Sequence, residues 1–241
     1  MNMNALHPHQ KPQSAAFTLI ELLTVIAIIA ILMGLLMSAL GGAKDQARRT
    51  EAGATVRNIV NACKSYYNDY GKYPPISSAA GTDFNSFGDT AKGKCKIANN
   101  ELFYVLRGIS LGFNSTPAAH SLNKRQQKYF EGPKAKDFKT PRSGFIDGAG
   151  YTPSATAPAG ALMDPWGTQY CIVLDTSGND EINIGTFYSD LDAASNPLNL
   201  LRFSAVAFSL GKDGDLGGKG YQGKYRKTGS SEAPDDIVSW Q

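Results

Sequence analysis

The stretch Phe17–Leu40 reads FTLIELLTVIAIIAILMGLLMSAL, and its charged residue is Glu21. As a helix with a rise of 1.5 Å per residue it would be about 36 Å long, enough to cross a hydrocarbon core of roughly 30 Å. A cleaved secretory signal has a shorter apolar core with small residues after it, so we expect cleavage before this segment. The sequence therefore predicts a leader peptide over residues 1–16 and one membrane-spanning helix over residues 17–40.

Glu21 is informative because a carboxylate inside an apolar helix is unfavourable, by about 2.5–3.5 kcal/mol on insertion scales. The segment contains no Lys or Arg that could pair with it. A cut after Ala16 would create an amine at Phe17, of the same chain or of a neighbouring copy, that could serve as the partner. The charge of Glu21 alone does not decide between this pairing and a second interpretation, in which Glu21 lies near the helix end and is hydrated.

An amphipathic pattern covers residues 41–73. Apolar residues recur there at intervals of three or four: Ala52, Val56, Ile59, Cys63, Tyr66 and Tyr70. This spacing predicts a helix with one apolar face that ends near Gly71 and is closed by the proline pair after it. We expect the rings of Tyr66, Tyr70 and Tyr73 to pack against the domain with their hydroxyls toward water.

The rest of the chain divides by composition into a variable, loop-rich region over residues 74–160 and a C-terminal β region over residues 161–241. A short helix is predicted at Glu101–Leu106 in the first region. Three short strands are predicted in the second, at Gln169–Leu174, Ile182–Phe187 and Phe203–Leu210. Antiparallel strands packed on a long helix would bury one face of their sheet, which predicts an α+β fold.

The ionisable residues argue against several functions. A formal net charge of +3 is too small to indicate a nucleic-acid partner. His120 is the one histidine after the leader, and nothing near it suggests Ser-His-Asp catalysis. Gly218–Lys224 has the GxxxxGK spacing of a phosphate-binding loop, but Tyr225 replaces the required Ser or Thr. The sequence therefore favours a structural protein over an enzyme.

The three cysteines are Cys63, Cys95 and Cys171, and their spacing fits no zinc or redox motif. Cys63 falls on the apolar face of the predicted helix, so we expect it to be buried. The sequence leaves open whether Cys95 and Cys171 form a disulfide outside the cytoplasm or remain free thiols.

The residues around the expected cut, AFTLIELL at Ala16–Leu23, resemble the prepilin cleavage and methylation motif of type IV pilins and type II secretion pseudopilins. The resemblance implies cleavage between Ala16 and Phe17 by a prepilin peptidase, followed by N-methylation of Phe17. It also implies that Glu21 pairs with the Phe17 amine of a neighbouring subunit during filament assembly. The family usually has Gly before the cut; Ala16 keeps the small size but bears on the rate of cleavage.

Three C-terminal phrases resemble the type II secretion major pseudopilin: DPWG at Asp164–Gly167, SLGKDG at Ser209–Gly214 and DDIVSW at Asp235–Trp240. The resemblance implies a pilin-like fold and a subunit that self-assembles into a pseudopilus for protein export. The implied partners are further copies in a helical filament, minor pseudopilins, the prepilin peptidase and the inner-membrane secretion platform. The implied location is the bacterial inner membrane, crossed once, with the globular domain in the periplasm.

The resemblance further implies one structural Ca²⁺ near the C-terminus. By this resemblance Asp213 and either Asp235 or Asp236 are its carboxylate ligands, with the Leu210 carbonyl as a further candidate. Carboxylate and carbonyl oxygens suit Ca²⁺, although the spacing is not that of an EF-hand. Without the resemblance, solvent-facing aspartates in turns would explain the same residues.

Two alternatives remain open. A type IV pilin for adhesion, motility or DNA uptake would share residues 16–40, but such pilins usually end in a loop closed by a disulfide. A membrane-anchored extracytoplasmic enzyme or binding domain would carry its functional groups in residues 76–160 and would not need Glu21.

Overall fold

The computed structural model describes residues 18–76, 84–90, 95–109, 122–147, 152–154, 156–188, 201–217 and 235–240. The chain divides into two compact units, Met1–Gln46 and Ala47–Gln241. The helix α1, Leu19–Tyr70, begins in the first unit and ends in the second. Each unit is described below in its own terms.

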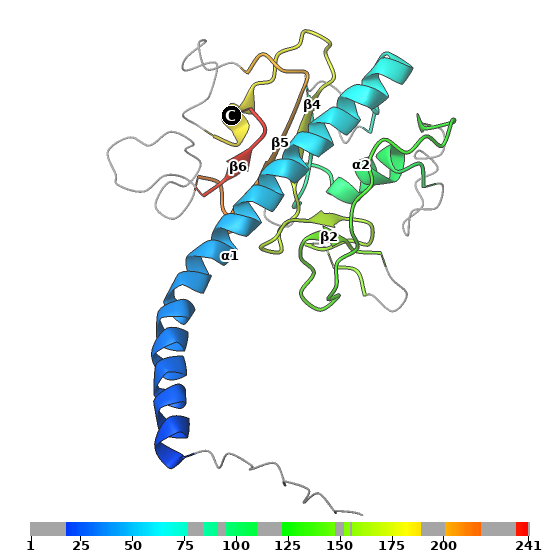
Figure 1. The fold of residues 1–241 in the computed structure, drawn as a ribbon. Helices are drawn as coiled ribbons and strands as arrows, with labels where there is room; N and C mark the ends of the chain where they lie inside the picture. The colour runs from blue at the N-terminus through cyan, green and yellow to red at the C-terminus, as the bar shows by residue number, and fades with distance from the viewer. Residues whose placement is uncertain are drawn as a thin grey trace, which may run out of the picture. The chain divides into compact units, whose positions relative to one another are not determined.

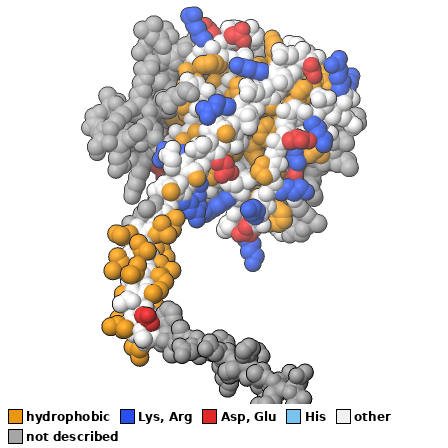
Figure 2. All heavy atoms as spheres, viewed as in Figure 1, with side chains coloured by type: hydrophobic (Ala, Val, Ile, Leu, Met, Phe, Trp, Pro, Cys, Tyr) orange, Lys and Arg blue, Asp and Glu red, His pale blue; other side chains and the backbone are white. Residues whose placement is uncertain are grey.

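In the first unit the structure describes residues 18–46, which form an apolar helix whose large side chains are not buried. Large apolar side chains along the helix from Leu19 to Leu40 are between 44% and 81% exposed. Figure 2 shows this apolar surface in orange on the described part of the helix. Its length and composition are those of a membrane-crossing segment. The apolar helix is consistent with a membrane-anchored protein.

The second unit uses the remainder of α1 as one wall of its core. The buried stripe on the helix consists of Ala52, Val56, Ile59, Ala62, Cys63 and Tyr66. These positions recur every three or four residues, as the sequence predicts. The helix ends at Tyr70, and Gly71 follows with φ +69° while its N–H donates to the Tyr67 carbonyl at 2.7 Å. A left-handed glycine at this point is a common way to end a helix.

A four-stranded antiparallel sheet packs on this wall, with strand order β1-β4-β5-β6. The strands are β1 Phe84–Phe87, β4 Cys171–Asp175, β5 Ala205–Ser209 and β6 Ile237–Val238. In Figure 1, β4, β5 and β6 lie beside the part of α1 that belongs to the second unit. A small second sheet joins β2 Gly144–Phe145 to β3 Leu162–Met163, and the helix α2 spans Asn99–Leu106. The α+β expectation is confirmed, and β1 adds a strand from the middle of the chain.

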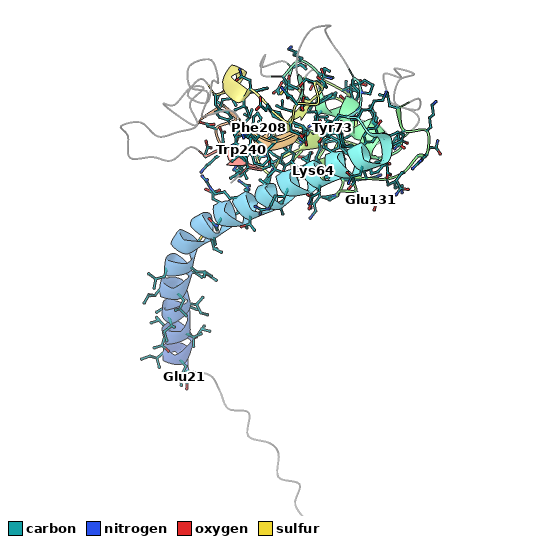
Figure 3. The ribbon with its side chains drawn as sticks, turned by 90° about the horizontal axis from the view of Figure 1, so that it is seen from above. Glu21, Lys64, Tyr73, Glu131, Phe208 and Trp240 are labelled. Atoms are coloured by element: carbon teal, nitrogen blue, oxygen red, sulfur yellow. The ribbon has the colours of Figure 1, made fainter. Side chains whose placement is uncertain are left out.

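Both faces of the main sheet are buried, whereas the sequence predicted one. Ile172 and Ala207 pack in the cluster that contains α1 and α2. Val173 and Phe208 point to the opposite side and pack in a second cluster. That cluster is closed by Phe187, whose ring lies 5.4 Å from the ring of Phe208, and by Trp240 (Figure 3).

The predicted strand Ile182–Phe187 is wrong, because the centre of this segment is a 3₁₀ helix, η1 Ile184–Thr186. Asn183 caps the turn, and its side chain accepts a hydrogen bond from the Gly185 N–H at 2.9 Å. Such side-chain acceptors compete with strand pairing. Apolar residues in a short run bury equally well in a turn, which is why the run resembled a strand.

The expectation that the tyrosine hydroxyls near the end of α1 face water is also wrong. Tyr66 and Tyr73 are 1% and 6% exposed. The Tyr66 hydroxyl donates to the Leu122 carbonyl at 2.8 Å. The Tyr70 hydroxyl donates to Asn123 Oδ1 at 3.1 Å, and the Tyr73 hydroxyl donates to Ser204 Oγ at 2.7 Å. Loops from distant parts of the chain cover this end of the helix and supply the acceptors.

Candidate assembly site and acidic loop

Glu21 lies in the first turn of α1, at the N-terminal end of the described chain (Figure 3). Its Oε2 accepts two hydrogen bonds from Thr18, one from the backbone N–H at 2.8 Å and one from Oγ1 at 2.7 Å. The Glu21 N–H in turn donates to Thr18 Oγ1 at 3.4 Å. This reciprocal pattern is a capping box, which satisfies backbone donors that a helix N-terminus leaves open. The sequence reasoning missed this role of Thr18, although Thr-x-x-Glu is its signature.

The capping arrangement leaves one carboxylate oxygen of Glu21 available to a cation. Both hydrogen bonds from Thr18 go to Oε2, and Glu21 Oε1 accepts none from the residues that the structure describes. Glu21 is exposed, so a group from another molecule can reach it. Ala16 and Phe17, the expected cleavage and methylation positions, lie outside the described residues.

The acidic loop consists of the turn after β5, residues 211–217, and Asp235-Asp236 before β6. Asp235 Oδ2 accepts hydrogen bonds from the backbone N–H groups of Lys212 at 2.6 Å and Asp213 at 3.1 Å. Gly211 permits this close approach, because a Cβ there would lie 2.5 Å from the Asp235 carbonyl oxygen, and its φ is +67°. Asp235 is thereby held against the turn that carries Asp213.

Asp236 lies deeper in the same loop and is 8% exposed. Its Oδ2 accepts hydrogen bonds from the Tyr188 hydroxyl and the Gly217 N–H, both at 2.7 Å. Burial raises the pKa of Asp236 to about 7, although these two hydrogen bonds oppose the rise. The negative charges of Asp235 and Asp213 raise it further. Three of the predicted metal-ligating side chains are therefore close enough to repel one another.

The donor set of the acidic loop fits a hard cation in one respect. Asp235 Oδ1 and Asp236 Oδ1 are both buried, and neither accepts a hydrogen bond within the described part of the chain. Two carboxylate oxygens without partners are unfavourable unless a cation or water satisfies them. Leu210, the fourth predicted ligand, is buried between β5 and the turn. Among the described residues, no group of three or more His, Cys, Asp or Glu side chains is arranged to hold a metal.

Asp164, in the DPWG phrase, is a fully buried carboxylate that the sequence reasoning did not single out. Its Oδ1 accepts hydrogen bonds from the N–H groups of Trp166, Gly167 and Thr168 at 2.7 to 2.9 Å. Its Oδ2 accepts from the hydroxyls of Thr168 and Ser209, each at 2.6 Å. Burial raises the pKa of Asp164, and the hydrogen bonds from Ser209, Thr168 and Gly167 oppose the rise. Asp164 therefore joins the turn after β3 to the end of β5 and has a structural role.

A groove of about 570 Å³ lies on the second unit and bears on the enzyme alternative. Its lining includes Lys139, Arg142, Ser154 and Trp166. Asp89 also lines it, and two of its hydroxyls, Ser154 Oγ and Thr156 Oγ1, lie 3.1 Å apart. His120 lies outside the described residues.

Comparison with known proteins gives one match. Residues 11–37 match the family model described as the prokaryotic N-terminal methylation motif. Neither a curated protein nor a solved structure matches the chain. The matched residues include the expected cut and Glu21, and they overlap the start of α1. The motif supports a type IV pilin-like protein, a class that includes both pilins and pseudopilins and whose members are structural.

Proposed function

We propose that this protein is a structural subunit of a periplasmic pseudopilus that drives protein export by type II secretion. The observation that carries the choice of pseudopilus over pilus is the acidic loop. There Asp235 and Asp236 hold the turn at 211–217 through backbone hydrogen bonds, and the cysteines of the second unit lie elsewhere. A type IV pilin would typically close this region with a disulfide instead.

Assembly begins from a subunit stored in the membrane through its apolar helix. Cleavage after Ala16 by the prepilin peptidase frees the Phe17 amine, which is then methylated. Glu21 is already oriented by Thr18, and its Oε1 is the acceptor for the Phe17 amine of the next subunit. In an apolar environment this charge pair offsets the roughly 2.5–3.5 kcal/mol that an unpaired carboxylate requires, and it sets the axial register. Each subunit docks on the one before it, and such a head-to-tail contact extends into an open filament.

We also propose a structural Ca²⁺ in the acidic loop. Asp235 Oδ1 and Asp236 Oδ1 would be its buried carboxylate ligands. The Asp213 carboxylate and the Leu210 carbonyl would be the further ligands from the protein. Bound Ca²⁺ would reduce the mutual repulsion of three carboxylates, which otherwise opposes closure of the loop. The hydrogen bonds from the turn to Asp235 and Asp236 connect the turn to the start of β6 with or without bound Ca²⁺.

The partners follow from the same proposal. The minor pseudopilins start the filament and the inner-membrane platform adds subunits, while a separate ATPase supplies the energy. The globular domain lies in the periplasm of a bacterium, and the single apolar helix lies in the inner membrane until assembly. The protein has no catalytic activity and no nucleic-acid partner of its own.

Deletion of the gene in the source bacterium tests this function. We expect secreted proteins to disappear from the medium and to accumulate in the periplasm, while surface pili and twitching persist. Complementation with the wild-type gene should restore export, and Glu21→Ala should fail to restore it although the protein reaches the membrane. Loss of pili with normal export would identify a type IV pilin instead. Restoration by Glu21→Ala would favour a membrane-anchored enzyme or binding domain.

A further inference from the structure

Cys95 and Cys171 are far apart in the sequence but lie in the same buried cluster. Both are free thiols in the structure, and they are 6% and 0% exposed. Cys171 is the first residue of β4, and Cys95 lies between β1 and α2. The third cysteine, Cys63, belongs to the other cluster, which contains α1.

Gly88 is the residue that lets the two thiols approach each other. Phe87 pairs with Ile172 in the antiparallel β1–β4 register, so Gly88 follows directly opposite Cys171. A Cβ on Gly88 would lie 2.7 Å from Cys95 Sγ and 2.9 Å from Cys171 Sγ. The two sulfur atoms therefore occupy the space above Gly88 that any other residue would fill with its side chain.

The main chain holds Cys95 on this side of the sheet. The Cys95 N–H donates to the Asp89 carbonyl at 3.4 Å. The Gly88 N–H donates to the Ile97 carbonyl at 2.7 Å, and the Ile97 N–H donates to the Ser86 carbonyl at 3.1 Å. The segment at 95–97 is thus paired along β1, and β1 is paired along β4. Cys171 is positioned by the β1–β4 pairing, and Cys95 is positioned by the backbone hydrogen bonds that place residues 95–97 beside β1.

The two thiols also interact directly. The hydrogen bond to Cys171, together with burial, raises the pKa of Cys95 well above its ordinary value. Burial alone raises the pKa of Cys63 to about 12. The Cys95 thiol is therefore not a ready nucleophile in the folded domain, and both thiols are buried, so oxidation would take place while the domain folds and the thiols are still accessible.

We propose that Cys95 and Cys171 form a disulfide when this domain folds in an oxidising compartment. The oxidant is an oxidised dithiol protein of the thiol–disulfide oxidase class. One cysteine, as thiolate, attacks the disulfide of the oxidant and forms a mixed disulfide, which releases one oxidant thiolate. The second cysteine, as thiolate, attacks the protein sulfur of this mixed disulfide and displaces the other oxidant sulfur. One protein disulfide forms, and the oxidant takes up two protons, equal to the two that the cysteines lose, and leaves as a dithiol.

The disulfide would connect the segment that leads into α2 with the central strand β4. It closes a loop of more than seventy residues, which restricts the unfolded chain. For a domain of this size, we expect the melting temperature to be about 10 °C higher than that of the reduced protein. Its formation in the cell rests on the periplasmic orientation proposed above, because disulfides persist in oxidising compartments. The pairing itself does not depend on that orientation, because it follows from the geometry around Gly88 and the backbone bonds of residues 95–97.

The test uses the full chain, solubilised in detergent, unfolded in reductant and then refolded with glutathione disulfide as the oxidant. Remaining thiols are alkylated in denaturant, and the unreduced protein is digested and analysed by mass spectrometry. We expect one linked peptide pair that joins Cys95 to Cys171, with Cys63 alkylated. Alkylation of all three cysteines, or a link that involves Cys63, would overturn the proposal.

Two variants make the result specific to this geometry. Cys63→Ala should leave the link intact, and Cys171→Ala should leave Cys95 fully alkylated. Failure of Cys63→Ala to form the link would count against the proposal. Protein quenched in acid directly from cells provides the separate test of compartment. A link that forms on refolding but is absent in cells would overturn the proposed periplasmic orientation, while leaving the pairing established.

Discussion

Replacement of Asp164 by Ala should destabilise the second unit strongly, because this carboxylate accepts five hydrogen bonds and is fully buried. The Gly167 N–H would keep a partner, since it also donates to the Asp164 carbonyl at 3.2 Å. The N–H groups of Trp166 and Thr168 would lose the acceptor that this side chain provides. The hydroxyls of Thr168 and Ser209 would lose theirs but could rotate toward other acceptors.

The magnitude follows from these donors. A fully buried donor left without a partner costs about 1–3 kcal/mol, and these two N–H groups are partly buried, so together they account for about 2–4 kcal/mol. Relief from burying a carboxylate reduces this, and the lost hydroxyl bonds add to it. We therefore expect a loss of about 3–4 kcal/mol in the free energy of unfolding. For a unit of this size that lowers the melting temperature by roughly 10 °C.

The assay is thermal unfolding of the full chain in detergent, followed by tryptophan fluorescence. Trp166 and Trp240 both lie in the second unit, so the signal does not report on the apolar helix. Asp164→Asn keeps an acceptor for the N–H groups and should lose less than half as much stability. Asp137→Ala is the matched control, because Asp137 is exposed and accepts two local hydrogen bonds. If Asp164→Ala and Asp137→Ala differ by less than about 1 kcal/mol, the reasoning is refuted.

Mass spectrometry of the protein from its native membrane should find a chain that begins with N-methylated Phe17, whereas an intact Met1 would show that Ala16 is not accepted before the cut. Addition of Ca²⁺ at about 100 times its Kd should stabilise the domain by roughly 2.7 kcal/mol. Asp236→Asn should abolish that gain, and an unchanged melting temperature of the wild type would contradict the calcium proposal. Tyr73→Phe removes the hydrogen bond to Ser204 and should cost about 1 kcal/mol in the same unfolding assay; an unchanged stability would contradict this and would mean that water replaces the Tyr73 hydroxyl as the partner of Ser204 without loss.

The apolar helix and the buried stripe of the second unit could be predicted because both depend on local periodicity. A helix places residues three or four positions apart on one face whatever the rest of the chain does. Ala52, Val56 and Ile59 are therefore buried as expected. The short helix near Glu101 and the strands at Cys171 and Ala205 were also expected, within a few residues of their ends.

The candidate site was predictable to a smaller extent. Glu21 stood out because a charge in an apolar run is costly, and the cleavage motif around it matches a family model. The partner of its Oε2 is Thr18, which follows from a local capping pattern that could have been recognised. The acidic residues near the C-terminus were found by their types, but which of their oxygens lack partners could not be known from their positions in the chain.

Contacts between distant segments were decided by the tertiary structure. The five donors to Asp164 include Ser209, and the two thiols above Gly88 come from Cys95 and Cys171. The hydroxyl of Tyr73 meets Ser204 and is not in water, because loops cover the helix end. Local sequence determines which face of a helix or strand is apolar, since that depends on backbone period. Which polar groups meet inside the core depends on how the chain returns on itself, and no local period encodes that.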